Sequence, residues 1–311
     1  MGLSSYRGRE CMPAISQGAT RTREGWGWLV GSLAMMNDQQ NSLAAAAVLV
    51  LETSTPLEKV SIGREFAVMW RNGLISEIGQ AGAPDRPARP EAPKLLLPRD
   101  LPKRKISAAP AGRIALLHAL AHIELNAIDL AWDMVARFAD HDLPWAFFDD
   151  WVGVADEESK HFALLAARLD NLGMAYGDLP AHDGLWAAAE STAHDLLARL
   201  AVVPLVLEAR GLDVTPAMVE RLRAVSDDQS ADILEIIYSD EIGHVAVGKR
   251  WFDHVAGMRS QEPVASWQTL VRHYFKGGVK PPFNVPAREA AGFSAAFYGP
   301  LGDEFTARKA S

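Results

Sequence analysis

The sequence predicts an all-α protein built around a four-helix bundle, with further helical segments before and after it. Four long segments between residues 111 and 258 repeat apolar residues at helical spacing, and glycine- or proline-rich stretches separate them. No strand-rich region is present, and 311 residues suit one domain with extensions or two small domains. The expected parts are a flexible N-terminal segment 1–41, a helical and proline-rich segment 42–110, the bundle 111–258 and a helical C-terminal extension 259–311.

The first helix is predicted to start at residues 55–58, TPLE, a capping box with proline at the first helical position, and to end at Arg71. The linker that follows holds seven of the 18 prolines, so it should run over the surface as an extended strap. Residues 86–113 of it carry eight Lys or Arg against two acids. The strap is therefore either a solvated connection or a docking surface for an anionic partner.

The bundle helices are expected over 111–140, 144–172, 184–210 and 227–257. Gly173 and Gly211 follow the second and third helices as C-caps, and Pro204 should bend the third or open a bulge in it. A short helix should follow Pro216, and a second capping box, SDDQ at 226–229, opens the fourth helix. Beyond the bundle, two short helices are expected in residues 260–311, separated by Gly277-Gly278 and Pro281-Pro282.

Composition limits the kinds of partner and of metal site. The formal net charge of −8 argues against a surface made for non-specific phosphate binding. Cys11 is the single cysteine, so no internal disulfide can form, and no CxxC motif is present for zinc or thiol redox chemistry. Any metal must therefore be held by His, Asp and Glu.

The N-terminal region leaves three interpretations. The longest apolar run, residues 43–51, has nine residues, against the ~20 needed to cross a bilayer. Residues 21–36 place arginines before an apolar patch, as a signal peptide does, but no convincing cleavage site follows. Alternatively, Met35 or Met36 is the true start. We expect a cytoplasmic protein with no membrane partner.

Two segments contain Glu-x-x-His, ESKH at 158–161 and EIGH at 241–244. Residues three apart on a helix are neighbours, with roughly 5–6 Å between Cβ atoms, so the Glu and His of each motif can reach one metal ion. A single motif of this kind is common by chance. The alternative interpretation is therefore a pair of exposed glutamates beside buried histidines.

The other two helices favour the metal site, because each places a glutamate in its apolar stripe: Glu124 in the first and Glu208 in the third. Buried carboxylates are rare unless they are paired or bind a metal. The order repeats, with 84 residues from Glu124 to Glu208 and 83 from Glu158 to Glu241. This arrangement matches the ligand set of ferritin-like di-iron and di-manganese bundles. The predicted ligands are Glu124, Glu158, His161, Glu208, Glu241 and His244, and the predicted cofactor is two iron ions, with manganese as the alternative.

Three further residues are expected to support these ligands. Glu157 and Asp240 each precede a motif glutamate, and could accept the second N–H of the histidine across the bundle or lie exposed beside it. Tyr238, one turn before the last motif, is either a redox-active phenol or a hydrogen-bonded core tyrosine. Three histidines lie off the metal face or too far along a helix to ligate: His118, His122 and His194.

The stretches around these residues resemble a bacterial ferritin-like family catalogued as a domain of unknown function. The resemblance covers about residues 40–260 and is carried by HALAHIELNAIDLAWD (118–133), VADEESKHFALL (154–165), YGDLPAHDGLW (176–186), VPLVLEARGLDVTP (203–216) and DEIGHVAVGKRWF (240–252). Within the wider superfamily the chain is most similar to the di-iron hydroxylase that modifies tRNA. The resemblance implies metal-ligand roles for the six residues named above, but it implies no substrate.

The leading hypothesis is an O2-activating di-iron oxidoreductase, an oxygenase or hydroxylase acting on an unidentified small molecule or RNA. Glu124 and Glu208 are the expected catalytic residues, as bridging carboxylates that shift to admit O2. Electrons must come from a separate donor, since the chain lacks rubrerythrin-type cysteines, and a homodimer is compatible with the sequence. The alternatives are an iron- or peroxide-handling protein without an organic substrate, and a scaffold that keeps metal for stability only.

Overall fold

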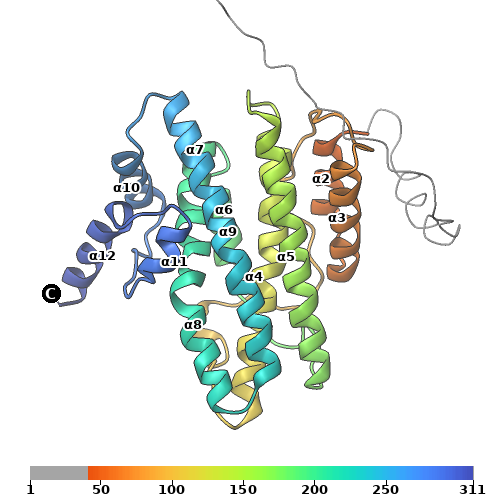
Figure 1. The fold of residues 1–311 in the computed structure, drawn as a ribbon. Coiled ribbons are helices and arrows are strands. Elements are labelled where there is room, and N and C mark those ends of the chain that lie inside the picture. Colours follow the sequence, from red (N-terminus) through yellow and green to blue (C-terminus); the bar gives the residue numbers. More distant parts are fainter. Residues whose placement is uncertain (1–40, 311) are drawn as a thin grey trace, which may run out of the picture. The chain divides into compact units, whose positions relative to one another are not determined.

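A computed structural model describes residues 41–310, and this part of the chain is all-α. Its long helices are α4 (Pro110–Arg137), α5 (Trp145–Asn171), α8 (Ala209–Ala224) and α9 (Asp228–Met258). Helix α4 packs on α5, α8 packs on α9, and α5 also contacts α9 (Figure 1). Within the described residues the one strand-like feature is an isolated bridge between Leu95 and Ala181. The expectations about Cys11, the alternative starts and the flexible segment 1–41 fall, except for Asn41, outside the described residues.

Two helices precede the strap, α2 (Leu43–Glu52) and α3 (Pro56–Arg71), and they pack on α4 and α5 respectively. Helix α3 has the predicted bounds, with Pro56 at its first position, where a missing N–H costs nothing. The predicted capping bond is absent, because the side chain of Thr55 accepts no hydrogen bond from the helix. Proline preorganisation and packing therefore start this helix without a capping box.

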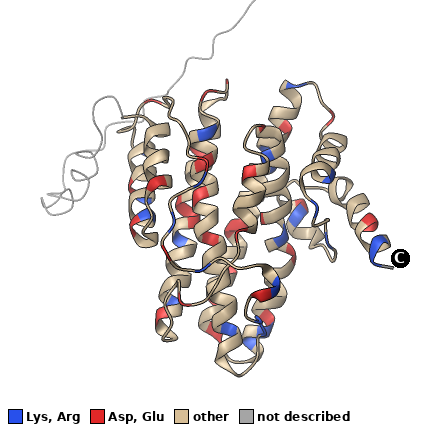
Figure 2. Cartoon of the chain, turned by 180° about the vertical axis from the view of Figure 1, so that it is seen from behind, with Lys and Arg blue, Asp and Glu red and all other residues tan. Residues whose placement is uncertain are grey.

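The strap runs as predicted without an α-helix, apart from the single 3-10 turn η2 (Pro98–Asp100). Ion pairs anchor two of its basic side chains to the helices: Arg86 pairs with Asp183 and Glu190, and Arg89 with Asp129. Arg113, expected at the end of the strap, lies in α4 and pairs with Asp227. Other basic residues of the strap remain exposed, namely Lys94, Arg99, Lys103, Arg104 and Lys105. Acidic and basic residues are interspersed over the helices (Figure 2).

Helix α4 is the most buried of the long helices. By length and composition it is the one described helix that could cross a membrane, yet 78% of its most apolar window is buried inside the protein. Contacts with α2 and α5 account for that composition. The next helix, α5, ends as predicted just before Gly173, whose φ of 75° is accessible to glycine at little cost.

The predicted third helix, 184–210, is wrong as a single helix. The structure has four consecutive elements there: α6 (Gly184–Ser191), α7 (Leu196–Val202), the π-helix η3 (Val203–Glu208) and α8. The chain breaks before α7, where the side chain of Asp195 accepts a hydrogen bond from the Leu197 N–H and caps a new helix. Pro204 lacks the N–H that an α-helix needs, and the predicted bulge forms there as η3. Gly211 does not end the helix, which continues through Pro216 to Ala224.

Helix α9 starts one residue later than the predicted capping box implies. The cap is Asp227, whose side chain accepts from the Ser230 N–H, whereas Ser226 has a φ of 57° and closes the preceding turn. Further along, Gly248 lies against η3, since a Cβ added to it would lie 2.3 Å from the Pro204 Cβ. The missing side chain thus lets α9 approach the π-helix closely.

After α9 the structure has three helices where two were predicted: α10 (Pro263–Tyr274), α11 (Val285–Ala290) and α12 (Ala295–Ala310). Buried Arg288 of α11 ties this extension to α8, because its Nε and Nη2 donate to the carboxylate of Asp213 at 2.9 and 2.7 Å. The extension therefore covers the outer side of α8 and α9.

Candidate metal centre

The six residues predicted as ligands come from α4, α5, η3 and α9. They are Glu124, Glu158, His161, Glu208, Glu241 and His244. Five are buried, with 9% or less of each residue exposed, and Glu208 is partly buried. Ligand atoms of Glu124, Glu158, His161 and Glu241 lie within 4.8 Å of one another, so this buried cluster could hold a metal ion.

Glu158 joins the two histidines. Its Oε2 lies 3.2 Å from the Nδ1 of His161, and its Oε1 lies 2.9 Å from the Nδ1 of His244. The Nδ1 of His161 also lies 3.4 Å from Glu124 Oε2, and that of His244 lies 3.6 Å from Glu241 Oε2. Both imidazoles thus present the same nitrogen, Nδ1, to the glutamates.

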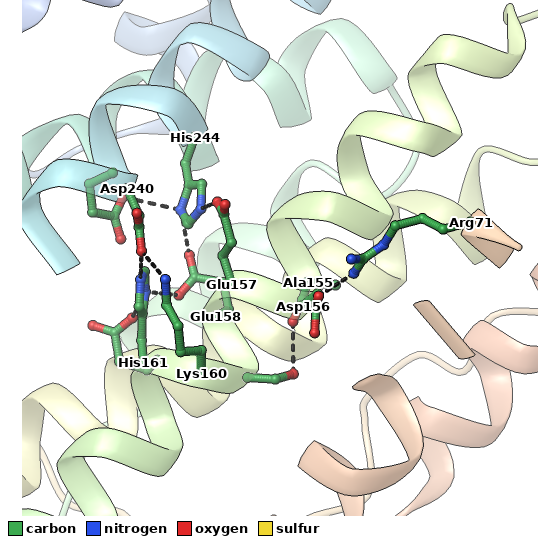
Figure 3. Close-up of polar contacts among 12 residues, drawn as sticks. Arg71, Ala155, Asp156, Glu157, Glu158, Lys160, His161, Asp240 and His244 are labelled. Carbon is green, nitrogen blue, oxygen red and sulfur yellow. Dashed lines mark hydrogen bonds and ion pairs between the residues drawn. The ribbon is translucent and has the colours of Figure 1, made fainter. Parts of the chain in front are cut away.

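The opposite nitrogen of each imidazole faces an acid on the other helix. His161 of α5 places Nε2 2.9 Å from Asp240 of α9, and His244 of α9 places Nε2 2.8 Å from Glu157 of α5 (Figure 3). Lys160 also reaches Asp240, at 2.5 Å. A carboxylate behind an imidazole fixes which nitrogen carries the proton and leaves the other free for a metal.

The buried glutamates differ from other buried acids of α4 in their partners. Asp129 pairs with Lys59 and Arg89, and Asp133 pairs with Arg199 and Arg137. By contrast, no Lys or Arg within the described residues pairs with the four glutamates. The charged partners of Glu124, Glu158 and Glu241 are the two histidines. Buried charge is costly without compensation, so this cluster is short of positive charge.

Unpaired polar atoms give a direct test of whether a metal ion fits. Among the predicted ligands, the buried atoms without a hydrogen-bond partner are Glu124 Oε2, Glu158 Oε1, Glu208 Oε2, Glu241 Oε2 and His244 Nδ1. The approach of His244 Nδ1 to Glu158 is close but not in hydrogen-bonding geometry. Five of the six predicted ligands thus have an atom that lacks a partner, as expected where a cation binds. The residues present fit a metal ion.

Burial is the first cause of the pKa shifts of three glutamates. Burial, followed by the charge of Glu158, raises the pKa of Glu124 well above its usual value and also raises that of Glu241. Burial and the charge of Glu241 likewise raise the pKa of Glu208 well above its usual value. Without a cation, these carboxyl groups favour their neutral form.

Glu158 and the histidines shift the other way. Burial alone would raise the pKa of Glu158, but the positive charge of nearby His244 and the hydrogen bond from His161 hold it well below the usual range. Burial opposes the charged form of His161, yet the carboxylates of Glu124 and Glu158 close to its Nδ1 raise its pKa to about 11. The charge of Glu158 likewise keeps the pKa of His244 well above its usual value. In the metal-free protein, protons on the imidazoles therefore supply the missing positive charge.

Other residues considered from the sequence lie elsewhere. Tyr238 is not brought to the cluster, because its hydroxyl accepts a hydrogen bond from Asn284 at 2.9 Å, before α11. His118 accepts from the backbone N–H of Gly177, and His194 contacts Tyr274. Tyr238 is thus a hydrogen-bonded tyrosine in this structure rather than a neighbour of the ligands.

Two residues near the cluster, Lys160 and Arg210, were not predicted from the sequence. Lys160 lies inside the first motif, and its contact with Asp240 depends on how α5 and α9 pack, which periodicity does not report. Arg210 follows Glu208 by two residues and lines the same cavity, but the predicted helix end at Gly211 hid it. A helix predicted to continue from Glu208 through Pro216 would have placed Arg210 within the same helix, close to the cluster.

Comparisons with known proteins identify the family of the chain. The family described as "Protein of unknown function (DUF455)" matches residues 52–299. A protein of Haemophilus influenzae named "Uncharacterized protein" is 40% identical over 262 residues, which cover 78% of this chain and 88% of the relative. No solved structure matches the chain significantly. By the extent of both matches, the chain belongs to the DUF455 family.

Proposed function

We propose that the protein is a ferritin-like di-iron oxidoreductase, an oxygenase or hydroxylase that acts on an organic substrate. One observation carries the proposal: three buried glutamates, the partly buried Glu208 and two buried histidines gather from four helical segments, and none of the six pairs with a Lys or Arg of the described part of the chain. The helical segments would be α4, α5, α7 to α8 with η3 between them, and α9, paired as a four-helix bundle.

The charge of the cluster supports two divalent ions. Four carboxylates carry four negative charges, which two such ions balance while the imidazoles stay neutral. Hard oxygen ligands with one imidazole for each ion suit iron or manganese better than copper or structural zinc. All six predicted residues would hold the pair, with Asp240 and Glu157 fixing the two imidazoles.

When bound, reduced iron would supply the electrons and open coordination positions that O2 activation requires. The chain's own residues orient the ligands, exclude water and place a substrate C–H beside the centre. One atom of O2 enters that bond to give an alcohol, and the other leaves as water with two electrons and two protons. A separate electron donor provides those electrons, because the single cysteine excludes an internal thiolate iron site. Glu124 and Glu208 would act as carboxylates that change position during the reaction.

A cavity favours an organic substrate over iron handling. A space of about 310 Å³ with mainly apolar walls includes Glu124, Glu208 and Glu241 in its lining. Small-molecule sites are typically concave, largely apolar and of this volume or larger. Handling of iron or peroxide alone requires no such space, so we keep that function as the second candidate.

The test is the number of Fe(II) ions oxidised per chain when metal-free protein receives excess iron and O2. If the centre is an oxygenase without its substrate, we expect oxidation to stop after about two Fe(II) ions per chain. Continued oxidation with soluble ferric mineral would establish the storage function instead. Elemental analysis of the reconstituted protein should return two metal ions per chain, and a single zinc would contradict the dinuclear centre.

A further inference from the structure

The cavity beside the glutamates opens towards a cluster of cations. Its lining includes the buried residues Glu124 and Glu241 and the exposed residue Lys280, so Lys280 marks the side that meets solvent. The wall between them is apolar and is built by α4, α8 and α9, through Leu120, Ile123, Val214, Met218, Leu234 and Ile237. A molecule that fills this space must therefore have an apolar body.

Two cations approach one acid in the lining, and the backbone of a third cationic residue lies beside them. Arg288 and Arg210 both approach Asp213 Oδ2, at 2.7 and 3.4 Å. Arg210 also donates to the backbone carbonyl of Lys280 at 2.8 Å, which brings the Lys280 segment to the same place. Asp213 is the one acid lining this end of the cavity, so two positive charges remain uncompensated there.

Arg288 supplies a second, independent observation. Its side chain is only 3% exposed, and its Nε and Nη2 are bonded to Asp213 and to the Ala209 carbonyl. Its Nη1 is buried without a hydrogen-bond partner, although Arg288 lines the cavity. The guanidinium also lies over the rings of Phe283, Phe293 and Tyr298, at 5.1, 5.5 and 4.5 Å from their centres. Aromatic faces do not accept as a carboxylate does, so the unpaired N–H is a bonding position that the chain itself does not fill.

Lys280 is the cation that is free to meet a ligand. It is exposed and forms no ion pair among the described residues, and its ammonium lies 5.9 Å from the ring of Phe305. An anionic group at the opening would gain charge-assisted hydrogen bonds from Lys280 and Arg210. The same group would meet the spare N–H of Arg288.

We propose that the cavity binds an amphipathic carboxylate, with its carboxylate among Lys280, Arg210 and Arg288 and its apolar chain directed at the glutamate cluster. The reaction at the ligand's apolar chain rests on the proposed function, whereas the binding of the ligand does not. The substrate class is thus a small carboxylic acid with an apolar body, and the C–H that reacts lies far from the carboxylate.

Calorimetry on iron-reconstituted protein, with metal content measured on the same samples, tests this assignment. Decanoate is the probe, and 1-decanol and decylammonium share its chain but not its charge. We expect decanoate to bind at least tenfold more tightly than 1-decanol, and decylammonium not to bind. Lys280→Gln should weaken decanoate about tenfold, as the loss of one charge-assisted contact does. Val214→Phe, which fills the wall, should weaken decanoate and 1-decanol alike.

The matched control is Lys276→Gln, which removes the same charge from an exposed position on the same segment outside this cavity. It should leave decanoate binding unchanged. Equal affinity for decanoate and 1-decanol, or equal effects of the two lysine substitutions, would overturn the carboxylate assignment. Decanoate binding by protein that fails to hold iron would support the assignment while refuting the di-iron proposal, so the two failures are distinguishable.

Discussion

At neutral pH, the buried carboxyl group of Glu208 lowers the free energy of unfolding of the metal-free protein. Its Oε2 is buried without a hydrogen bond, and burial together with the charge of Glu241 raises its pKa well above the usual value. In the unfolded chain the carboxyl ionises at its ordinary pKa, so the folded state binds more protons. The contribution of Glu208 to stability is therefore present at low pH and is lost as the pH rises above that ordinary value.

The substitution Glu208→Gln should consequently have opposite effects on stability and on metal binding. Without metal, we expect the free energy of unfolding at neutral pH to rise by roughly 1–3 kcal/mol, because no carboxylate has to be buried. Bound iron should fall to half or less. Urea unfolding of the metal-free protein and elemental analysis measure the two effects. Glu220→Gln, an exposed change on α8, should alter neither; full metal content in the Glu208→Gln variant would remove Glu208 from the ligand set.

His122 predicts a pH dependence unconnected with the metal. Burial, and next the charge of Arg89, lowers its pKa to about 4. Its Nε2 lies 3.2 Å from the His182 carbonyl oxygen, which can only accept, so Nε2–H donates and Nδ1 accepts from the Tyr176 hydroxyl at 2.9 Å. The folded protein therefore holds a neutral imidazole, whereas the unfolded chain takes up a proton below about pH 6.5.

Acidification from pH 7.5 to 5 should thus destabilise the protein through His122 by about 2 kcal/mol. The measurement is the difference in unfolding free energy between the wild type and His122→Gln at both pH values. That difference should shift by this amount in favour of the variant at pH 5. A constant difference would mean that His122 titrates alike in the folded and unfolded chains.

At the scale of elements, the contrast between α5 and the third predicted helix shows what the sequence can determine. Helix α5 has one apolar stripe and a glycine stop, and its bounds agree with the prediction to within a residue. The third segment is apolar on nearly every side before Glu208, so periodicity could not reveal the break that Asp195 caps. The prediction that Gly211 ends this helix is wrong, because α8 continues through it to Ala224.

The candidate site was predictable for a different reason. A glutamate in an apolar stripe and a Glu-x-x-His pair are local patterns, so the sequence could single out residues that the fold brings together. Four of them have ligand atoms within 4.8 Å of one another, His244 lies beside Glu158, and Glu208 lines the same cavity as Glu124 and Glu241. The cations at the cavity opening come from separate elements, Arg210 from α8 and Arg288 from α11. Nothing local marks Arg288 as buried beside Asp213, and only the packing of the C-terminal extension brings the two together.

The contact between α9 and η3 supplies a prediction at this scale. Gly248→Ala would place a Cβ 2.3 Å from the rigid ring of Pro204, so the π-helix must move. We expect a loss of about 1–3 kcal/mol in the free energy of unfolding and less bound metal, since η3 carries Glu208. Gly243→Ala is the control on the same helix, because a Cβ there meets nothing within 4 Å. It should stabilise α9 slightly. Equal effects of the two substitutions would show that the close approach is unimportant.

For the whole molecule, the strap joins parts that are held together independently of it. Helices α2 and α3 pack on α4 and α5, and buried Lys59 of α3 pairs with Asp129 of α4. Arg137 also donates to the Pro84 carbonyl at 2.6 Å. These contacts lie on both sides of the exposed segment 99–105 in sequence, so a cut there would not release either part.

Limited trypsin digestion should therefore cut the described residues first at Lys103, Arg104 or Lys105, which are exposed and outside any helix. The two pieces should elute together from a sizing column in native buffer and separate only in denaturant. Bound metal should be retained after the cut. A variant with all three residues changed to Gln should resist cleavage there; separation of the pieces in native buffer would show that the strap itself holds them.

The exchange of acids between the two histidines has a consequence for origin. Asp240 precedes the motif of α9 and bonds to His161, while Glu157 precedes the motif of α5 and bonds to His244. Reciprocal contacts, in which residue i of one unit meets residue j of the other and j meets i, are typical of two-fold symmetry. Helices α4 and α5 supply Glu124, Glu158 and His161, and η3 and α9 supply Glu208, Glu241 and His244. Neither helical hairpin holds all six residues by itself. Two copies of one ancestral hairpin, associated as a dimer, would have brought together the same six residues. Duplication and fusion of its gene would then have left one copy free to acquire Pro204.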